Sequence, residues 1–558
     1  METYRLRIVV FMVVILFGVG VAAAENEGTI TSIPDSNKRL TILISDLHIG
    51  PGRDDKAPEK WMNIEDFRWE DEFSEFLDFV DKEGKGNADL IILGDMFELW
   101  QSANMDCTGQ GITLRCTVRD CEHGDKELGC TEVEALARTK RAISQHAKTF
   151  DSLKNFASAG SNRVVILPGN HDAALLYPSV AREVISAIAK GPVDETDCFD
   201  KSRVCISKKG SWMSSDARIY ADHGHQFDKA NRFDDWPDPV KKRNGNAKTY
   251  LERPFGEQMV QAFYNRYEER FPILDNLEKE SDGITLGFQT EGVGLIDDFA
   301  EFARFLFLKI SWRQFRDFTG EQKEGQPPKW DLDKILKEDS PEFLIDSIPT
   351  GDPLRTVAEE SFRQKKFELR PSQLTRDELQ ELCDYKMLRR KRGDKAVVEC
   401  PRAGKTTGKV LDMVLDREKE NLTEHLFTVY GAMKAVDPKS KRFSIYLYGH
   451  THQASPQNST NLMTLQKKGD RPWTLKVINT GAFQRVVNKD QLNQIKERFR
   501  SQGGKDRDIL TTLKPEDLPA CYTFVRIDQY NDKPNPLILK WVKGKGGKWM
   551  QNKSCISP

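Results

Sequence analysis

The stretch LTILISDLHIG (residues 40–50) joins an apolar run to a carboxylate and an imidazole. Its first five residues have the length and the side chains of a buried β-strand. Asp46 and His48 follow this run two residues apart. Side chains with that spacing on an extended chain point the same way, so both can reach one cation. The end of the first predicted strand is therefore a candidate metal site.

Four further polar motifs lie at the ends of predicted strands, and the motifs together contain six of the nine histidines. The four motifs are Gly94-Asp95, Gly169-Asn170-His171-Asp172, the pair His223 and His225, and the pair His450 and His452. One such motif is common by chance, but five at successive strand ends have few structural explanations. Oxygen and imidazole ligands without thiolate suit Mn, Fe, Zn or a mixed pair. The sequence therefore predicts a metal centre.

The order of predicted elements indicates an α/β (α+β) fold. Strands are expected at residues 40–44, 90–93, 164–167, 219–221, 443–448 and 475–478, with helices at 64–80, 132–158 and 173–190. Strands that alternate with amphipathic helices predict βαβ units. Such sheets carry their chemistry in loops at the carboxyl ends of strands.

Between about residues 228 and 441 the apolar residues take helical spacing. We interpret residues 229–440 as a large, mainly helical insertion between two parts of a catalytic core, at 38–228 and 441–545. Its aromatic stripe is typical of packing rather than of a ligand box. Because both ends of the insertion adjoin metal motifs, we expect it to act as a cap over the site. A separate folded domain is the alternative.

The amino-terminal residues and the charge balance bear on location and partners. Arg5 and Arg7 precede an apolar stretch and then Ala22-Ala23-Ala24, which is typical of a signal peptide, here residues 1–24. The alternative is an uncleaved membrane anchor, the one case in which a membrane is an expected partner. With 84 basic and 86 acidic residues, no recognition of nucleic acid is evident. The expected location is secreted or periplasmic.

Cysteine usage agrees with export. The ten cysteines form an even set, with four in a loop at residues 100–131, then Cys198 with Cys205, Cys383 with Cys400, and Cys521 and Cys555. In an oxidising compartment such groups predict disulfides, although the connectivity does not follow from sequence. Zinc binding by the four-cysteine loop is the alternative, but that loop lacks a CxxC pair.

The five motifs in their order resemble the pattern of the calcineurin-like metallophosphoesterases. The motif sequences are most similar to those of the branch that contains the UDP-2,3-diacylglucosamine hydrolases. These motifs are SDLHIG, GDMFELW, GNHD, HGHQFD, GHTHQ and INTGAFQR. Serine/threonine protein phosphatases have an aspartate–arginine pair where this chain has residues 97–100, Phe-Glu-Leu-Trp. The chain departs from the protein phosphatases in this respect.

The resemblance implies a two-sheet sandwich flanked by helices and a site with two metal ions. By position in the motifs, metal one would be held by Asp46, His48 and His452, and metal two by Asn170, His223 and His450, with Asp95 bridging both. His171 would stabilise or protonate the leaving oxygen, with Asp172 as its orienting partner. For His225, substrate contact and a hydrogen bond to a carboxylate such as Asp228 are both open.

The implied function is hydrolysis of a phosphomonoester or phosphodiester outside the cytoplasm. The cations, Mn, Fe or Zn, would share a hydroxide that attacks the phosphorus of a phosphate-ester substrate. One alternative is a pyrophosphate hydrolase acting on a nucleotide-linked lipid or sugar. An alternative of another class is a non-catalytic scaffold of the same fold.

Overall fold

The computed structural model describes sixteen segments of the chain. They are residues 39–101, 128–190, 202–228, 230–242, 249–261, 265–277, 340–347, 359, 362–363, 370, 418–456, 461–467, 469–504, 509–530, 533–544 and 546–555. All of them belong to the second of two compact units, Arg39–Pro558. No helix among these residues is long and apolar enough to cross a membrane.

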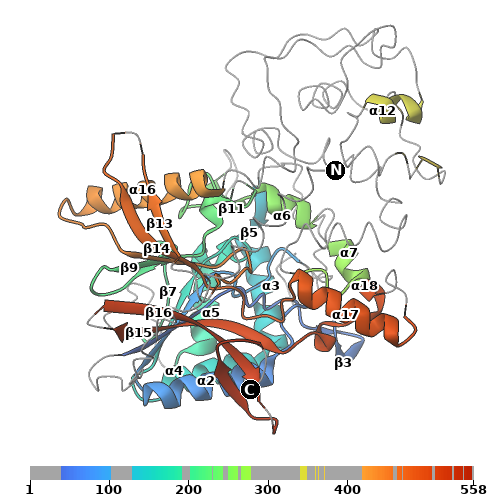
Figure 1. Ribbon diagram of the computed structural model, residues 1–558, viewed down its shortest axis with the longest axis horizontal. Helices are drawn as coiled ribbons and strands as arrows, with labels where there is room; N and C mark the ends of the chain where they lie inside the picture. Colours follow the sequence, from blue (N-terminus) through green and yellow to red (C-terminus); the bar gives the residue numbers. More distant parts are fainter. Residues whose placement is uncertain are drawn as a thin grey trace, which may run out of the picture. The chain divides into compact units, whose positions relative to one another are not determined.

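The described strands and helices are as follows (Figure 1). The strands are β1 (Leu40–Ile44), β2 (Arg53–Asp54), β3 (Ala57–Trp61), β4 (Ala88–Leu93), β5 (Leu128–Thr131), β6 (Arg163–Leu167), β7 (Val204–Ile206), β8 (Ser211–Met213), β9 (Ile219–Asp222), β10 (Val240–Lys242), β11 (Thr249–Glu252), β12 (Ile445–Tyr448), β13 (Leu462–Leu465), β14 (Trp473–Asn479), β15 (Cys521–Tyr530), β16 (Lys533–Lys543) and β17 (Trp549–Asn552). The helices are α2 (Glu70–Gly84), α3 (Glu132–Gln145), α4 (Ala147–Ser158), α5 (Pro178–Ile188), α6 (Phe255–Met259), α7 (Asn265–Arg270), α12 (Pro341–Ser347), α16 (Glu418–Val436), α17 (Lys489–Ser501) and α18 (Ile509–Thr512). Three 3-10 helices are η2 (Ala173–Leu176), η3 (His225–Phe227) and η9 (Pro515–Asp517).

Two sheets form the core. The larger has the order β17-β16-β15-β1-β4-β6-β7, and the smaller has the order β13-β14-β12-β9-β8. β1, β4, β6 and β7 are parallel, and β12 is parallel to both of its neighbours, β9 and β14. Parallel strands end at one edge of their sheet, which gathers the loops that follow them.

The two faces of β1 divide the core into two apolar layers. Leu43 packs with Leu93, Leu167, Leu447 and Ile478, which come from both sheets. The neighbours Ile42 and Ile44 instead pack with residues of α2, α4 and α5. Successive side chains of a strand alternate between faces. The two-sheet sandwich flanked by helices, predicted from the sequence, is therefore confirmed.

Helix α16 packs against the smaller sheet. Leu422, Leu426 and Phe427 of α16 pack with Leu465 of β13 and Trp473 of β14. Figure 1 shows α16 beside these two strands, all in orange. The described residues of the segment 229–440 also include β10 and β11, which form a three-stranded sheet with β5. Neither strand was predicted from the sequence. The predicted role of this segment as a cap stays a prediction.

The helix predicted at residues 64–80 begins later, at Glu70. Before it, the Glu65 carboxylate accepts hydrogen bonds from the main-chain N–H of Gly50, Gly52 and Phe67. These bonds hold the chain just before α2 in a non-helical conformation. The following Glu70, Asp71 and Glu72 place negative charge at the helix N-terminus, where it is stabilising.

The other two predicted helices are each divided. The helix predicted at 132–158 is interrupted at His146, between α3 and α4. The His146 ring is fully buried, with Nε2 3.2 Å from Glu65 Oε2. The helix predicted at 173–190 is divided before Pro178, which lacks an N–H and begins α5.

Cys521 and Cys555 form a disulfide that joins the start of β15 to the chain after β17. Cys130 is disulfide-bonded as well. The signal peptide expected at residues 1–24 and the cysteines at 107, 116, 121, 198, 383 and 400 lie outside the described residues.

Candidate metal centre

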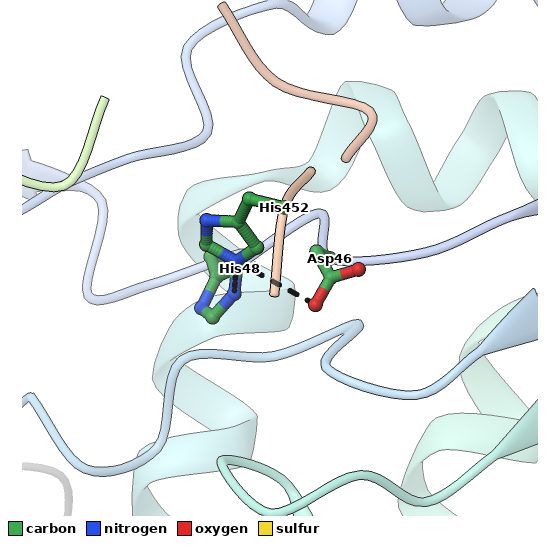
Figure 2. A group of neighbouring side chains, drawn as sticks. All are labelled: Asp46, His48 and His452. Atoms are coloured by element: carbon green, nitrogen blue, oxygen red, sulfur yellow. Dashed lines mark hydrogen bonds and ion pairs between the residues drawn. The ribbon is translucent and has the colours of Figure 1, made fainter. Parts of the chain in front are cut away.

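The first group of ligand atoms belongs to Asp46, His48 and His452 (Figure 2). Asp46 and His48 follow β1, and His452 follows β12. The Nε2 atom of His452 lies 3.5 Å from Asp46 Oδ1 and 3.1 Å from His48 Nε2. The structure thus brings together the three residues assigned to metal one from the sequence.

The second group belongs to Asp95, His223 and His450. Asp95 follows β4, and His223 follows β9. The Nε2 atom of His223 lies 2.8 Å from Asp95 Oδ2 and 3.0 Å from Asn170 Oδ1. Asn170 therefore joins this group, and all seven predicted ligands lie at the ends of strands in two adjacent groups.

Main-chain hydrogen bonds connect the two groups. The His450 N–H donates to both carboxylate oxygens of Asp46, at 3.1 and 3.2 Å. The His48 N–H donates to the carbonyl oxygen of Asp95, at 3.0 Å. Each group is therefore positioned partly by a residue of the other, which suits a centre with two neighbouring cations.

The hydrogen bonds around the histidine rings show whether the residues fit a metal. His223 Nδ1 lies 2.7 Å from the carbonyl oxygen of Leu93, which can only accept, so Nδ1 carries a hydrogen. His48 Nδ1 faces the Glu98 carboxylate at 3.0 Å, and His450 Nε2 faces the Asp228 carboxylate at 2.9 Å. Outer acceptors of this kind orient metal-binding imidazoles and leave the other ring nitrogen as a ligand. The donor set therefore fits divalent or trivalent cations.

The backbone at these residues is strained. Among the residues that the structure describes, eight other than glycine have positive φ. Five of them are predicted ligands: Asp46, His48, Asp95, His450 and His452, with φ between 49° and 70°. Each such residue costs on the order of 1–3 kcal/mol and persists where its surroundings hold it. The concentration of backbone strain at the predicted ligands indicates a functional site.

Glycines before two of the ligands make room for close approach. A Cβ at Gly449 would lie 2.6 Å from Asp46 Oδ2 and from Ser45 Oγ. A Cβ at Gly169 would overlap the Asp95 carboxylate. The neighbouring residues His450 and Asn170 can therefore reach the centre only because these positions carry no side chain.

The charges of the site shift its pKa values. Burial lowers the pKa of His223, but the charge of Asp95 and its hydrogen bond outweigh burial and raise this pKa to about 9. Burial raises the pKa of Asp95, yet the charges of His223 and His171 bring it well below its usual range. In the metal-free protein a proton on His223 thus balances Asp95, in the position where a cation would do so.

His171 lies beside the first group, against the carboxylate of Glu98, which was not predicted from the sequence as a site residue. Its Nδ1 forms an ion pair with Glu98 Oε2, the same oxygen that faces His48. Its ring stacks on Trp100, with centroids 4.0 Å apart. Burial raises the pKa of Glu98, but the charge of His171 and hydrogen bonds from His171 and His48 lower it to about 2. The His171 side chain keeps 17% of its surface exposed, so it can meet a substrate.

Asp172 makes contacts other than the expected one with His171. Its two carboxylate oxygens accept hydrogen bonds from the main-chain N–H of Gly169 at 2.6 Å, Met96 at 2.8 Å and Phe97 at 3.2 Å. Burial and the charge of Asp95 raise the pKa of Asp172 to about 7. Asp172 therefore joins the loops that carry Asp95 and Asn170, and the carboxylate against the His171 ring is Glu98.

Asp228 pairs with His450, as described above, rather than with His225. The His225 ring instead lies edge-on to Trp236, with centroids 4.4 Å apart. Burial and the charges of His223 and His450 hold its pKa well below the usual range. His225 is therefore a neutral, enclosed side chain next to the second group.

Asn479 is a further supporting residue, from the INTGAF motif. Its Nδ2 donates to the carbonyl oxygen of Gly449 at 3.0 Å and to Thr451 Oγ1 at 2.7 Å. It thereby fixes the loop that presents His450 and His452. The sequence signal for Glu98, Asp228 and Asn479 was their place inside the quoted motifs, but their partners lie far away in the chain.

Residues 40–268 match the family model of the calcineurin-like phosphoesterases. The match supports the metallophosphoesterase family. This family consists of metal-dependent phosphoric ester hydrolases, and the chain is an enzyme of this class. His450 and His452 lie beyond the matched residues, and it is the fold that brings them to the site. No curated protein and no solved structure gave a match to the chain.

Proposed function

We propose that this chain is an exported phosphoesterase that uses two metal ions to hydrolyse a phosphomonoester or phosphodiester. One observation carries the proposal: seven ligand side chains and His171 converge from the ends of five strands, β1, β4, β6, β9 and β12. A scaffold protein has no need for so many strained, oriented ligands in one place.

The metal-binding residues and His171 would have different roles in the reaction. When bound, the cations would polarise the phosphoryl oxygens and lower the pKa of a water molecule. Asp95 and Asp46 would supply negative charge that offsets the repulsion between the two cations. With Nδ1 of His171 against Glu98, its other ring nitrogen, Nε2, is the atom that can give a proton to the leaving oxygen.

Export is supported by the amino-terminal pattern and by the disulfide between Cys521 and Cys555. Disulfides persist in oxidising compartments and are rare in the cytosol. We therefore propose a secreted or periplasmic location. Mass spectrometry of the mature amino terminus tests it: a protein that begins near residue 25 supports export, and an intact Met1 in a cytosolic fraction contradicts it.

The decisive experiment measures hydrolysis of a phosphoester panel by metal-free protein to which Mn, Fe or Zn is added. The panel contains phosphomonoesters, phosphodiesters and a nucleotide-linked diphosphate, because the motifs resemble a branch that acts on the last class. The comparison variant is Asp95→Asn, which should lose metal two and lower turnover by at least about a hundredfold. This is the largest effect usually seen when only a hydrogen-bond partner of a metal ligand is changed, and Asp95 is a proposed ligand itself. Full activity in this variant would overturn the assignment of Asp95.

Metal content separates the proposal from a non-catalytic scaffold. We expect two equivalents of metal per chain after reconstitution with Mn, measured by elemental analysis. A protein that takes up no metal and hydrolyses none of the panel would favour the scaffold.

A further inference from the structure

Asp222 is the last residue of β9 and directly precedes the ligand His223. Its buried carboxylate accepts a hydrogen bond from the Tyr446 hydroxyl at 2.6 Å on one oxygen. The other oxygen lies 2.8 Å from His425 Nε2. Because a carboxylate can only accept, the His425 N–H is the donor. A side chain of α16, 203 residues away, is thus bonded to the residue next to a predicted metal ligand.

The bond from His425 is not the only contact that holds α16 on the protein. Leu422, Leu426 and Phe427 of this helix are buried against the smaller sheet. The burial of three such side chains together contributes more to docking the helix than a single hydrogen bond to a charged group does. The His425–Asp222 bond is therefore available for a role besides docking the helix.

The position of Asp222 shows what the bond can do. β9 and β12 are parallel neighbours, with Tyr446 opposite Tyr220. These strands lead to His223 and His450, two ligands assigned to metal two. The Gly449 N–H donates to the carbonyl oxygen of His223 at 3.0 Å. Asp222, the last residue of β9, is bonded to the neighbouring β12 through Tyr446, and His425 bonds the remaining oxygen of that carboxylate.

We propose that His425 is a positioning residue that couples α16 to metal two through Asp222. The inference rests on the proposed metal centre. It adds a role for the segment 229–440 that is separate from access to the site: this segment supplies a hydrogen bond that keeps His223 and His450 at the spacing one cation needs. Outer-shell partners of metal ligands typically contribute 10–100-fold to metal affinity or activity.

The test is calorimetric titration of the metal-free, full-length protein with Mn²⁺, which reads out metal affinity without any substrate. The site that Asn170→Ala weakens identifies metal two. We expect His425→Phe to weaken metal two by about 10–100-fold and to leave metal one unchanged. His425→Gln keeps an N–H donor and should restore metal two to within a few-fold of the wild type. Glu424→Gln, an exposed change on the same helix, is the matched control and should bind as the wild type does.

The outcomes separate this inference from the proposed function. If the wild type binds two equivalents of Mn²⁺ and His425→Phe leaves metal two unchanged, or weakens both sites equally, the coupling is wrong. If the wild type binds no metal, the proposed function itself fails. Tyr446→Phe keeps the ring and removes the other hydrogen bond to Asp222, so it serves if His425→Phe does not fold. Unchanged metal two affinity in Tyr446→Phe would overturn the role of Asp222.

Discussion

The Glu98 carboxylate lies 3.0 Å from Nδ1 of His48, and the same oxygen also forms an ion pair with His171. One buried carboxylate therefore contacts both a predicted metal ligand and the predicted general acid. Its other oxygen accepts the main-chain N–H of Trp100 at 2.8 Å and of Gln101 at 3.1 Å. Glu98 is thus held by the backbone in a position where its charge acts on both rings.

The change Glu98→Gln tests this shared role. The amide is neutral and nearly isosteric, so it removes the charge that favours N–H at both Nδ1 atoms and leaves the packing intact. We expect kcat to fall by about 10–100-fold and the affinity for metal one to fall as well. Steady-state kinetics and Mn²⁺ titration measure the two effects.

Glu75 provides the control for Glu98, because it is an exposed glutamate of α2. Glu75→Gln should leave kcat and metal affinity unchanged. A Glu98→Gln protein with wild-type kcat would show that the two rings do not depend on this carboxylate.

Gly449→Ala tests the close approach at metal one. The added methyl group would lie 2.6 Å from Asp46 Oδ2, so the loop with His450 and His452 must move away. We expect loss of metal one and a fall in activity of at least about a hundredfold, beyond the usual range for outer-shell changes. The control is Gly431→Ala in α16, where a methyl group meets nothing within 4 Å. It should slightly stabilise the helix, by up to about 1 kcal/mol. Normal metal binding in Gly449→Ala would contradict the model of a crowded loop.

The clustering of the candidate ligands could be predicted from sequence because each lies shortly after an apolar strand. A run such as residues 40–44 predicts a buried strand, and parallel strands bring their ends to one edge. This inference applies to Asp46 and His452 without any knowledge of which residues their side chains contact. The location of the site follows from where the predicted strands end along the chain, and local sequence patterns indicate those ends.

The partners of the ligands could not be predicted in the same way. Asp228 and His450 are separated by 222 residues, and Asp222 and His425 by 203. Such pairs depend on how α16 and the loops pack, and the local spacing of apolar and polar residues in the sequence does not indicate this packing. The helix boundary at Glu70 was missed for a related reason: Glu65 bonds main-chain groups of a distant loop, and this tertiary contact overrides helical spacing.

Asp172→Asn distinguishes two roles for that residue. The carboxylate accepts three main-chain N–H groups, and an amide offers only one oxygen, so at least one buried donor loses its partner. We expect the free energy of unfolding to fall by about 1–3 kcal/mol. Chemical denaturation measures this, with the exposed change Asp151→Asn in α4 as the control. A loss of kcat with unchanged stability would instead favour the original expectation that Asp172 orients His171.

The pH dependence of the metal-free protein tests the electrostatics of metal two. The pKa of His223 is raised from 6.5 to about 9, chiefly by Asp95 against the opposing effect of burial. A group with a raised pKa in the folded state stabilises the protein below its unfolded pKa, and this contribution is lost as the pH rises through the folded pKa. The metal-free wild type should therefore lose stability between pH 7 and 9, whereas His223→Gln should not show this loss. Bound metal replaces the proton, so the loaded wild type should not show it either, and binding should release a proton. Thermal unfolding across this pH range measures the effect. Parallel curves for metal-free wild type and His223→Gln would rule out the proposed proton on His223.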